Sequence, residues 1–318
     1  MLTRTLLRIG AAGLGLTVAL ATAACGSDDA AEASDGEAIT LTLGIPPVGD
    51  SLPVYQAIDR GYFEDAGLDI ELVPAANGAT TINTLVGQST DLALVSYPSL
   101  INAYASDLPV TGAATAISGT DEYKAGLYVP ADSDIETPAD MIGKRMATPS
   151  LGSVGDIWFR GVLLDEGLDY NGVDYVELPQ ANMASALAAG DVDGAFITEP
   201  TLSAASKSLE LRAIDYQNGP QGLFATSKQT LEDKPEAIKA FREALARAVE
   251  DIDADPHGVA TEQMPKHTDM DEATAAEMNL PDFITEWDGE GVQAVIDLMA
   301  EVGLVKESFD ADELYEQL

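Results

Sequence analysis

The sequence has little of the side-chain chemistry on which most enzymes and nucleic-acid-binding proteins depend. Its 318 residues include one cysteine, two histidines and 16 lysines and arginines, against 54 aspartates and glutamates, and the formal net charge is −38. A single cysteine excludes an intrachain disulfide. A surface this acidic repels nucleic acid and anionic lipid headgroups, so we expect neither as a direct partner of the folded chain.

The two histidines do not form a recognisable catalytic or metal-binding motif. His257 and His267 are ten residues apart, which matches none of the compact helical metal spacings, and aspartates lie close to both. The chain also has no Gly-x-Ser-x-Gly elbow, no paired cysteines and no evident Ser-His-Asp set. We therefore expect a protein that is not an enzyme, with no metal site and no cofactor.

The acidic residues are distributed through segments that also carry an apolar periodicity. This pattern is typical of a folded, charged surface and not of a disordered acidic tail. With so few lysines and arginines to balance the carboxylates, the composition suggests a halophilic adaptation, in which high salt screens the self-repulsion of the surface.

The N-terminus has the features of a bacterial lipoprotein signal peptide. Two arginines in MLTRTLLRIG precede a short apolar stretch, AAGLGLTVALATAA, which is too short for a membrane-spanning helix. Ala23 and Ala24 before Cys25 resemble a lipobox, although Thr22 stands where leucine is usual. The alternative is a stray cysteine near an ordinary cleavage site. We predict a signal peptide over residues 1–24 and a lipid on Cys25.

Residues 25–38 contain small and acidic side chains without a large apolar residue before the first strand. Such a segment is expected to be a flexible linker between the lipidated cysteine and the folded part. The predicted location is the outer face of the cytoplasmic membrane, periplasmic or extracellular, and a tethered monomer is expected.

One ten-residue pattern occurs twice. DLALVSYPSL at 91–100 and DGAFITEPTL at 193–202 share Asp, Ala, two large apolar residues, a hydroxyl residue, Pro and Leu, at a constant offset of 102. This period is too long for a solenoid repeat. The length and the 46% hydrophobic content suffice for two modest domains or one large one. The repeat favours two similarly built lobes, each with a strand leading into a helix that begins with Pro.

Strand and helix patterns alternate on both sides of the middle of the chain, which favours parallel α/β units. The predicted strands are 39–45, 68–73, 91–96, 144–148, 173–178 and 193–198. The longest helix is predicted from 234 to 255, with one apolar face. Pro-, Gly- and Asp-rich segments place hinges near 130 and 219. The first lobe would then comprise 38–130 plus 219–318, and the second lobe 131–218.

In parallel α/β sheets, ligands bind beyond the carboxyl ends of the strands. The repeated motif places Ser96 and Tyr97 at one such end and Thr198 and Glu199 at another. Helix capping is an equally good explanation of the two hydroxyls. Tyr97 and Glu199 are stronger candidates for ligand contact, because capping does not require them.

The segment TPSLGSVGDIW, residues 148–158, predicts an anion site, because a flexible loop precedes a helix whose first N–H groups are free. It lacks the Gly-Lys-Ser/Thr of a P-loop, and a plain tight turn is the alternative. A carboxylate in the first turn would compete with an anion for the helix dipole. The candidate residues here are Ser150, Gly152, Ser153, Asp156 and, as a stacking surface, Trp158.

Two loops of the first lobe occupy corresponding positions. They contribute the candidates Asp50, Ser51, Asn77, Gly78 and Thr80. If Asp50 and Glu199 face the cleft, the ligand should present donors, and a bare anion would be repelled. Five aromatic residues could stack on a planar ligand, although aromatic residues at helical spacing more often belong to a core. They are Trp158, Tyr55, Tyr97, Tyr123 and Phe224.

Four segments together resemble nitrate/sulfonate/taurine-type solute-binding proteins, which are related to binding proteins for thiamine-pyrimidine precursors. They are YQAIDRGYFEDAGLDIELV, ADMIGKRMATPSLGSVGD, ALAAGDVDGAFITEP, with Gly194 where Ala is usual, and KPEAIKAFREALARAVE. The resemblance implies a two-lobed periplasmic-binding-protein fold of the second type, in which each lobe is a mostly parallel sheet flanked by helices. It also implies a small-molecule solute in the interlobe cleft and an ABC permease and ATPase as partners.

The resemblance leaves the solute and the output open. The acidic loops and the aromatic residues favour a nitrogenous planar or amine-bearing solute over bare nitrate. A ligand-sensing lipoprotein that signals to a membrane receptor is the alternative function. A related eukaryotic pyrimidine synthase is a remote one, because its chemistry relies on a Cys-rich segment and an active-site histidine that this chain does not match.

Overall fold

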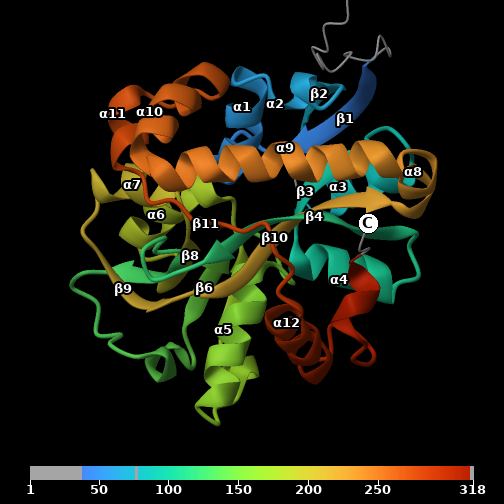
Figure 1. The fold of residues 1–318 in the computed structure, drawn as a ribbon. Helices are drawn as coiled ribbons and strands as arrows, with labels where there is room; N and C mark the ends of the chain where they lie inside the picture. The colour runs from blue at the N-terminus through green and yellow to red at the C-terminus, as the bar shows by residue number, and fades with distance from the viewer. Residues whose placement is uncertain (1–37, 76–77, 316–318) are drawn as a thin grey trace, which may run out of the picture. The chain divides into compact units, whose positions relative to one another are not determined.

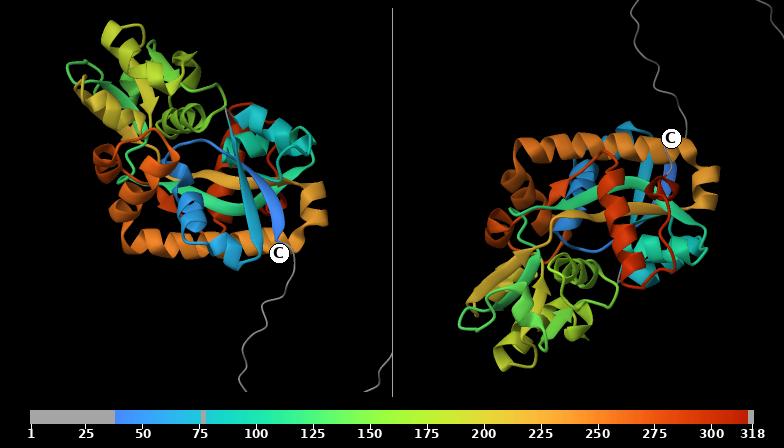
Figure 2. Two further views of the ribbon diagram at one scale, coloured as in Figure 1. Left: turned by 90° about the horizontal axis from the view of Figure 1, so that it is seen from above. Right: turned by 90° about the horizontal axis from the view of Figure 1, so that it is seen from below.

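The computed structural model describes residues 38–75 and 78–315. The predicted signal peptide, Cys25, nearly all of the linker, and Asn77 lie outside the described residues. The described part is an α/β structure with two sheets, ordered β11-β4-β10-β3-β1-β2 and β7-β6-β8-β5-β9 (Figure 1). Figure 2 shows the elements between β5 and β9 gathered together beside the first sheet, and α5 among them contacts α4 and α12.

The strands of the first sheet are β1 Ile39–Ile45, β2 Leu68–Pro74, β3 Leu92–Ser96, β4 Val110–Gly119, β10 Gly219–Ser227 and β11 Asp282–Phe283. Those of the second sheet are β5 Gly126–Pro130, β6 Arg145–Thr148, β7 Asp174–Glu177, β8 Gly194–Ile197 and β9 Leu211–Tyr216. The six strands predicted from the sequence are therefore all present.

Helices cover both faces of each sheet, as expected for α/β units. The first sheet is covered by α1 Leu52–Asp59, α2 Tyr62–Asp65, α3 Gly78–Val86, α4 Tyr97–Ala105, α8 Lys228–Asp233, α9 Pro235–Ala254, α10 Pro256–His267, α11 Glu272–Glu277 and α12 Gly289–Glu301. The second is covered by α5 Val154–Asp165, α6 Gln180–Ala189 and α7 Thr201–Ser206.

The long helix α9 shows how the sequence pattern becomes packing. Its apolar face, predicted from a 3.6-residue period, is buried at Ile238, Phe241, Leu245, Val249 and Ile252. This face packs across the first sheet, where Phe241 contacts the rings of Phe63 and Phe224 at centroid distances of 5.4 and 5.2 Å. Burial of each large apolar side chain stabilises the fold by roughly 1.5–3 kcal/mol.

The sheets are mixed, whereas the sequence predicted mostly parallel ones. Strands β1, β2 and β3 pair in parallel, as do β6, β7 and β8. The strands that carry the chain between the sheets pair antiparallel, β4 with β10 and β5 with β9. The reason is topological: the chain crosses to the second sheet once and returns once, so the outgoing and returning strands run side by side in opposite directions.

The strand β5 lies in the second sheet, although the predicted boundary at 130 places it in the first lobe. The chain thus passes between the sheets in residues 120–125 and returns in residues 217–218. The two crossings touch, because Gln217 N–H donates to the Ala125 carbonyl at 2.7 Å. Glycine is required at both ends of the first crossing, since a Cβ on Gly119 or Gly126 would lie 2.4 or 2.2 Å from a carbonyl oxygen of the returning chain.

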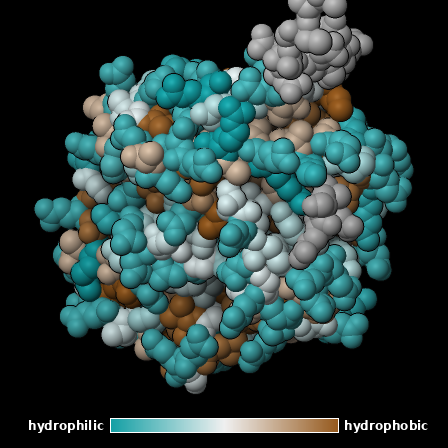
Figure 3. Space-filling view, in the orientation of Figure 1, coloured by the Kyte–Doolittle hydropathy of each residue, from teal (hydrophilic) through white to brown (hydrophobic). Residues whose placement is uncertain are grey.

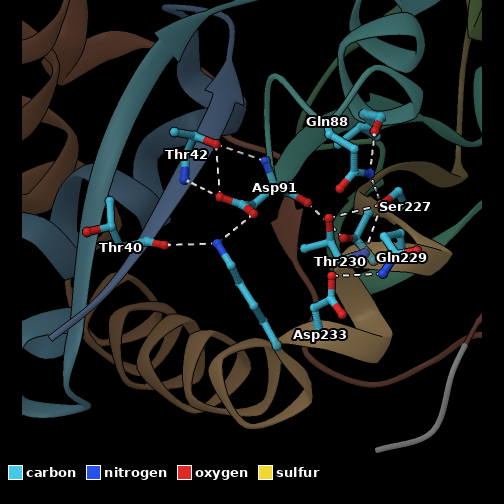
Figure 4. Close-up of polar contacts among 11 residues, drawn as sticks. Thr40, Thr42, Gln88, Asp91, Ser227, Gln229, Thr230 and Asp233 are labelled. Carbon is cyan, nitrogen blue, oxygen red and sulfur yellow. Dashed lines mark hydrogen bonds and ion pairs between the residues drawn. The ribbon is translucent and has the colours of Figure 1, made fainter. Parts of the chain in front are cut away.

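The aspartate that opens each copy of the repeated motif has the same role in both sheets. Asp91 accepts the Thr42 N–H of β1 at 2.9 Å, and Asp193 accepts the Arg145 N–H of β6 at 2.9 Å. Figure 4 shows Asp91 held between Thr42 and the residues around Ser227. Lys234 adds an ion pair with Asp91 at 2.8 Å. The repeat at an offset of 102 therefore encodes two equivalent strand junctions.

The face seen in Figure 3 is covered mainly by hydrophilic residues, with apolar ones in small separate groups. Among the described residues, no helix combines the length and apolar character needed to cross a membrane. Within the same residues, no group of His, Cys, Asp and Glu side chains is arranged to hold a metal ion.

Candidate ligand-binding site

A cavity of ≈ 580 Å³ lies where the ends of strands from both sheets meet. From the first sheet and its loops it is lined by Pro46, Asp50, Ala75, Thr81, Leu94, Val95, Ser96, Ser99, Ile117, Gln221 and Gly222, and from the crossing by Tyr123. The second sheet and its loops contribute Pro149, Ser150, Ser153, Val154, Gly155, Pro179, Gln180, Phe196 and Thr198. This volume is suited to a small organic molecule.

The hydroxyls of the repeated motif both reach this cavity. Ser96 also caps α4, since its Oγ accepts the Ser99 N–H at 3.3 Å and shares a hydrogen bond with the Ser99 hydroxyl at 2.8 Å. Within the described ranges, the Thr198 hydroxyl makes one long contact, of 3.5 Å to the Glu199 carbonyl, and no side chain there caps α7. The Thr198 hydroxyl therefore keeps most of its hydrogen-bonding capacity.

The loop between β6 and α5 supplies a group of donors. Ser150 and Ser153 line the cavity, and the Ser153 hydroxyl is 2.9 Å from that of Thr148. The first N–H groups of α5, on Val154 and Gly155, have no partner among the described residues. A Cβ on Gly155 would lie 2.3 Å from the Phe196 ring, so the ring packs directly against the helix start. Free N–H groups at a helix N-terminus favour an anionic or acceptor group.

Asp156, a predicted ligand contact, instead supports this loop from behind. It is 1% exposed and does not line the cavity. Its carboxylate pairs with Arg160 at 2.7 Å and accepts the N–H of Gly152, also at 2.7 Å. Gly152 has a φ of 75°, which allows the turn that brings its N–H to Asp156. The ion pair with Arg160 compensates the negative charge that the sequence places in the first turn of α5.

Asp50 is the one charged residue that lines the cavity in the described part of the chain. It sits in a 3₁₀ turn after β1, is half-buried, and accepts a hydrogen bond from the Tyr123 hydroxyl at 3.1 Å. Burial raises the pKa of the Asp50 carboxyl to about 6, although the Tyr123 hydrogen bond acts in the opposite direction. Burial and the neighbouring Asp50 charge also hold the pKa of Tyr123 well above its usual value.

Two glutamines complete the polar lining. Gln180, the first residue of α6, donates from Nε2 to the Phe196 carbonyl at 3.3 Å. Its Oε1 is buried without a partner among the described residues. Gln221, on β10, donates to the Oε1 of Gln217 at the crossing. Gln180 follows the carboxyl end of β7, so the strand-end rule could have indicated it. No sequence pattern indicates Gln221, because it lies near the start of β10, just after the returning crossing.

The two residues ranked highest from the sequence do not line the cavity. Tyr97 is 0% exposed and packs in the core near Trp287, at a ring distance of 6.2 Å. Glu199 is 5% exposed, and its carboxylate accepts from Asn279 Nδ2 at 2.6 Å and from the Ser203 N–H and hydroxyl at 3.0 Å each. Glu199 thus joins α7 to the segment before β11.

The remaining candidates are also used elsewhere or lie beside the cavity. Ser51 is buried and donates from Oγ to the Pro46 carbonyl at 2.7 Å. Trp158 packs in the second-sheet core, where its ring centroid lies 5.8 Å from those of Phe159 and Phe196. Gly78 begins α3, and Thr80 is an exposed residue on the same helix. Thr81, the next residue, lines the cavity instead.

Comparison with known proteins gives a consistent result. The family model described as NMT1/THI5 like matches residues 49–259. The chain is 24% identical over 236 residues to a formylaminopyrimidine-binding protein of Halalkalibacterium halodurans, covering 72% of this chain and 70% of that protein. It is 24% identical over 230 residues to the taurine-binding periplasmic protein of Escherichia coli, covering 70% of each.

Two further groups of relatives bear on function. A putative ABC transporter periplasmic binding protein of Brachyspira hyodysenteriae is 24% identical over 306 residues, 86% of each chain. A Saccharomyces cerevisiae 4-amino-5-hydroxymethyl-2-methylpyrimidine phosphate synthase is 22% identical over 244 residues, covering 69% of this chain and 68% of the synthase.

Solved structures confirm the predicted fold. The alkanesulfonate-binding protein of Xanthomonas axonopodis pv. citri, bound to MOPS, superposes with a TM-score of 0.74 at 21% identity, covering 89% of this chain and 100% of the other. The periplasmic aliphatic sulphonate-binding protein of Escherichia coli gives a TM-score of 0.73 at 19% identity, covering 87% and 92%. The chain therefore has the α/β periplasmic-binding-protein fold.

Proposed function

The chain belongs to the NMT1/THI5-like family, and we propose that it is an extracytoplasmic solute-binding protein that delivers a small organic, nitrogen- or sulfur-containing solute to an ABC importer. The observation that carries the proposal is the cavity of ≈ 580 Å³, to which equivalent strand ends of the two sheets contribute Ser96 and Thr198. A site built from both sheets on a chain with two narrow crossings suits a protein that closes on its ligand.

A binding role is favoured over catalysis by the lining of the cavity and by the relatives. Hydroxyls, amides, two aromatic rings and one carboxylate can hold and orient a solute. Relatives named as binding proteins match over 70% or more of this chain. The yeast synthases match to a similar extent, but His257 and His267 lie on α10 and neither lines the cavity.

We further propose that the protein is a monomer attached by a lipid on Cys25 to the outer face of the cytoplasmic membrane, with an ABC permease and ATPase as partners. The sequence before and around Cys25 supports the anchor. Metabolic labelling with palmitate should label the wild type and not Cys25→Ala, and equal labelling of the two would contradict the anchor.

The proposed function predicts closure on binding. Soluble protein, residues 26–318, should be stripped of solute by unfolding and refolding and then screened by thermal shift against taurine, alkanesulfonates, nitrate and aminopyrimidines. A compound that raises the melting temperature should also reduce the radius of gyration in X-ray scattering, because both sheets contribute contacts. A compound without a thermal shift serves as the control. A bound solute with no change in radius would contradict closure.

A further inference from the structure

The cavity presents a negative charge without a compensating positive one. Asp50 lines it, and in the described part of the chain no lysine, arginine or histidine does. The Tyr123 hydroxyl is the one side chain that donates to this carboxylate among the described residues. A carboxylate removed from water without a cationic partner is costly, and the cost is relieved when a ligand supplies the charge or the donors.

Gln180, which also lines the cavity, carries a second acceptor, and this one has no donor among the described residues. The Nε2 of Gln180 donates to the Phe196 carbonyl, which orients the amide and leaves Oε1 unpaired. An unsatisfied buried acceptor costs free energy that a hydrogen bond from a ligand would recover. Asp50 and Gln180 come from different sheets, so a donor-bearing ligand would engage both sides of the cavity.

The start of α5 has the opposite preference. The free N–H groups of Val154 and Gly155, together with the hydroxyls of Ser150 and Ser153, can donate to a ligand oxygen or ring nitrogen. The cavity thus combines an acceptor region at Asp50 with a donor region at α5. This combination matches a solute that carries a donor group and an acceptor group, and not a symmetric anion.

The charge of the whole protein acts in the same direction. A formal net charge of −38 attracts cationic solutes and repels anionic ones over distances up to the screening length. An inorganic anion would have to overcome this field and then bind beside Asp50. An ammonium group is attracted both by the field of the whole protein and by the Asp50 carboxylate.

We propose that the solute carries an amino group that donates to Asp50, either as an alkylammonium or on a heterocycle, together with an acceptor group that faces the start of α5. The inference rests on the proposed function and specifies the substrate class of the same site. Nitrate and alkanesulfonates without an amino group are weak ligands in this scheme.

Two matched pairs of probes test the proposal by titration calorimetry. Taurine is compared with 1-propanesulfonate, in which a methyl group replaces the ammonium, and 4-aminopyrimidine with 4-methylpyrimidine. In at least one pair the amino compound should bind at least tenfold more tightly. Asp50→Asn should remove most of that difference, because the carboxylate is lost while an acceptor for Tyr123 remains. Asp132→Asn removes an equal charge from an exposed position and should leave the difference in affinity between the amino and the methyl compound unchanged.

The outcomes separate this inference from the proposed function. Equal or tighter binding of the methyl compounds would overturn the amino-group assignment and leave solute binding intact. Binding of the amino compound that is unaffected by Asp50→Asn would overturn the role of Asp50. Failure of all four probes to bind at millimolar concentration would count against both proposals.

A pH series adds a second test, because the affinity for taurine would not follow the ionisation of Asp50 if Asp50 had only a structural role. Burial raises the pKa of Asp50 to about 6, so the carboxylate is mostly protonated at pH 5 and mostly ionised above pH 7. The groups around it are Tyr123, whose pKa is raised, and Arg242 and Tyr315, which line a small cavity of ≈ 30 Å³ that Asp50 also lines. Taurine affinity should rise about tenfold from pH 5 to pH 7 in the wild type. It should stay flat in Asp50→Asn, and a flat wild-type profile would overturn the assignment.

Discussion

Replacing Gly126 by alanine should lower the free energy of unfolding by about 3 kcal/mol or more, which is at the upper end for an overpacked site. Gly126 begins β5, and a Cβ there would lie 2.2 Å from the Asp215 carbonyl oxygen and 3.0 Å from the Tyr216 Cα. Both atoms belong to the backbone of β9. Side-chain rotation cannot relieve the overlap, so the pairing of β5 with β9 must shift.

The matched control is Gly44→Ala in β1. A Cβ at Gly44 would lie 3.4 Å from the Ala93 Cβ, an ordinary contact, in a strand with the same need for extended backbone. Gly44→Ala should change the free energy of unfolding by no more than about 1 kcal/mol, because the reduced entropy of the unfolded chain offsets a slight crowding in the folded one. Urea unfolding of the two variants measures the difference. Equal midpoints would show that the crossing strands tolerate the extra atom.

Replacing Asp156 by alanine should lower the free energy of unfolding by about 3–5 kcal/mol, the range for removing one partner of a buried ion pair. Asp156 is 1% exposed, and its partner Arg160 would be left buried with 16% of its side chain accessible. The Arg160 guanidinium lies over the Tyr175 ring at 4.1 Å, so it cannot readily turn to solvent. The N–H of Gly152 would also lose its acceptor, which frees the Ser150–Ser153 loop.

The Asp156 variant should therefore affect both stability and solute affinity, since the released loop lines the cavity. Asp65→Ala provides the control. The Asp65–Arg247 pair spans 3.1 Å, but its side chains are 63% and 48% exposed, so its loss should change stability by less than about 1 kcal/mol. Denaturant unfolding and calorimetry on both variants make the comparison. Unchanged affinity in a folded Asp156→Ala protein would show that the loop is positioned without Asp156.

Much of the fold could be predicted because its parallel strands carry alternating or continuous apolar patterns bounded by helix signals. The strands β4, β5, β9, β10 and β11 are not among the six predicted, and β4 and β5 show a physical reason. Strand β4, VTGAATAISG, is built of small residues that are buried on both faces, so it shows no alternation. The apolar segment of β5 is short and merges with a loop rich in Pro and Asp, which resembles a linker.

The site could be predicted only as far as the strand-end rule extends. It located Asp50, Ser96, Ser150, Ser153 and Thr198, which line the cavity. It failed one residue further along the chain, where the strand has already ended: Tyr97 is the first residue of α4, and Glu199 lies in the turn before α7.

Ser96 and Thr198 line the cavity, whereas Tyr97 is buried in the core and Glu199 accepts a hydrogen bond from Asn279. The sequence indicates Tyr123 only as a ring that could stack on a ligand, because its position depends on an irregular crossing. Gln180 and Gln221 are not among the residues that the sequence indicates.

The two crossings also constrain how the protein moves. Residues 120–125 and 217–218 are the strand-to-strand passages between the sheets, and the Gln217–Ala125 hydrogen bond holds them together. Two adjacent attachments define a line, so bending about that line is easy while sliding and twisting are resisted. We expect a mechanism with essentially one rotational degree of freedom. Such a joint leaves each wall of the cavity rigid while the opening changes, so selectivity for a solute depends on the angle at which the walls meet.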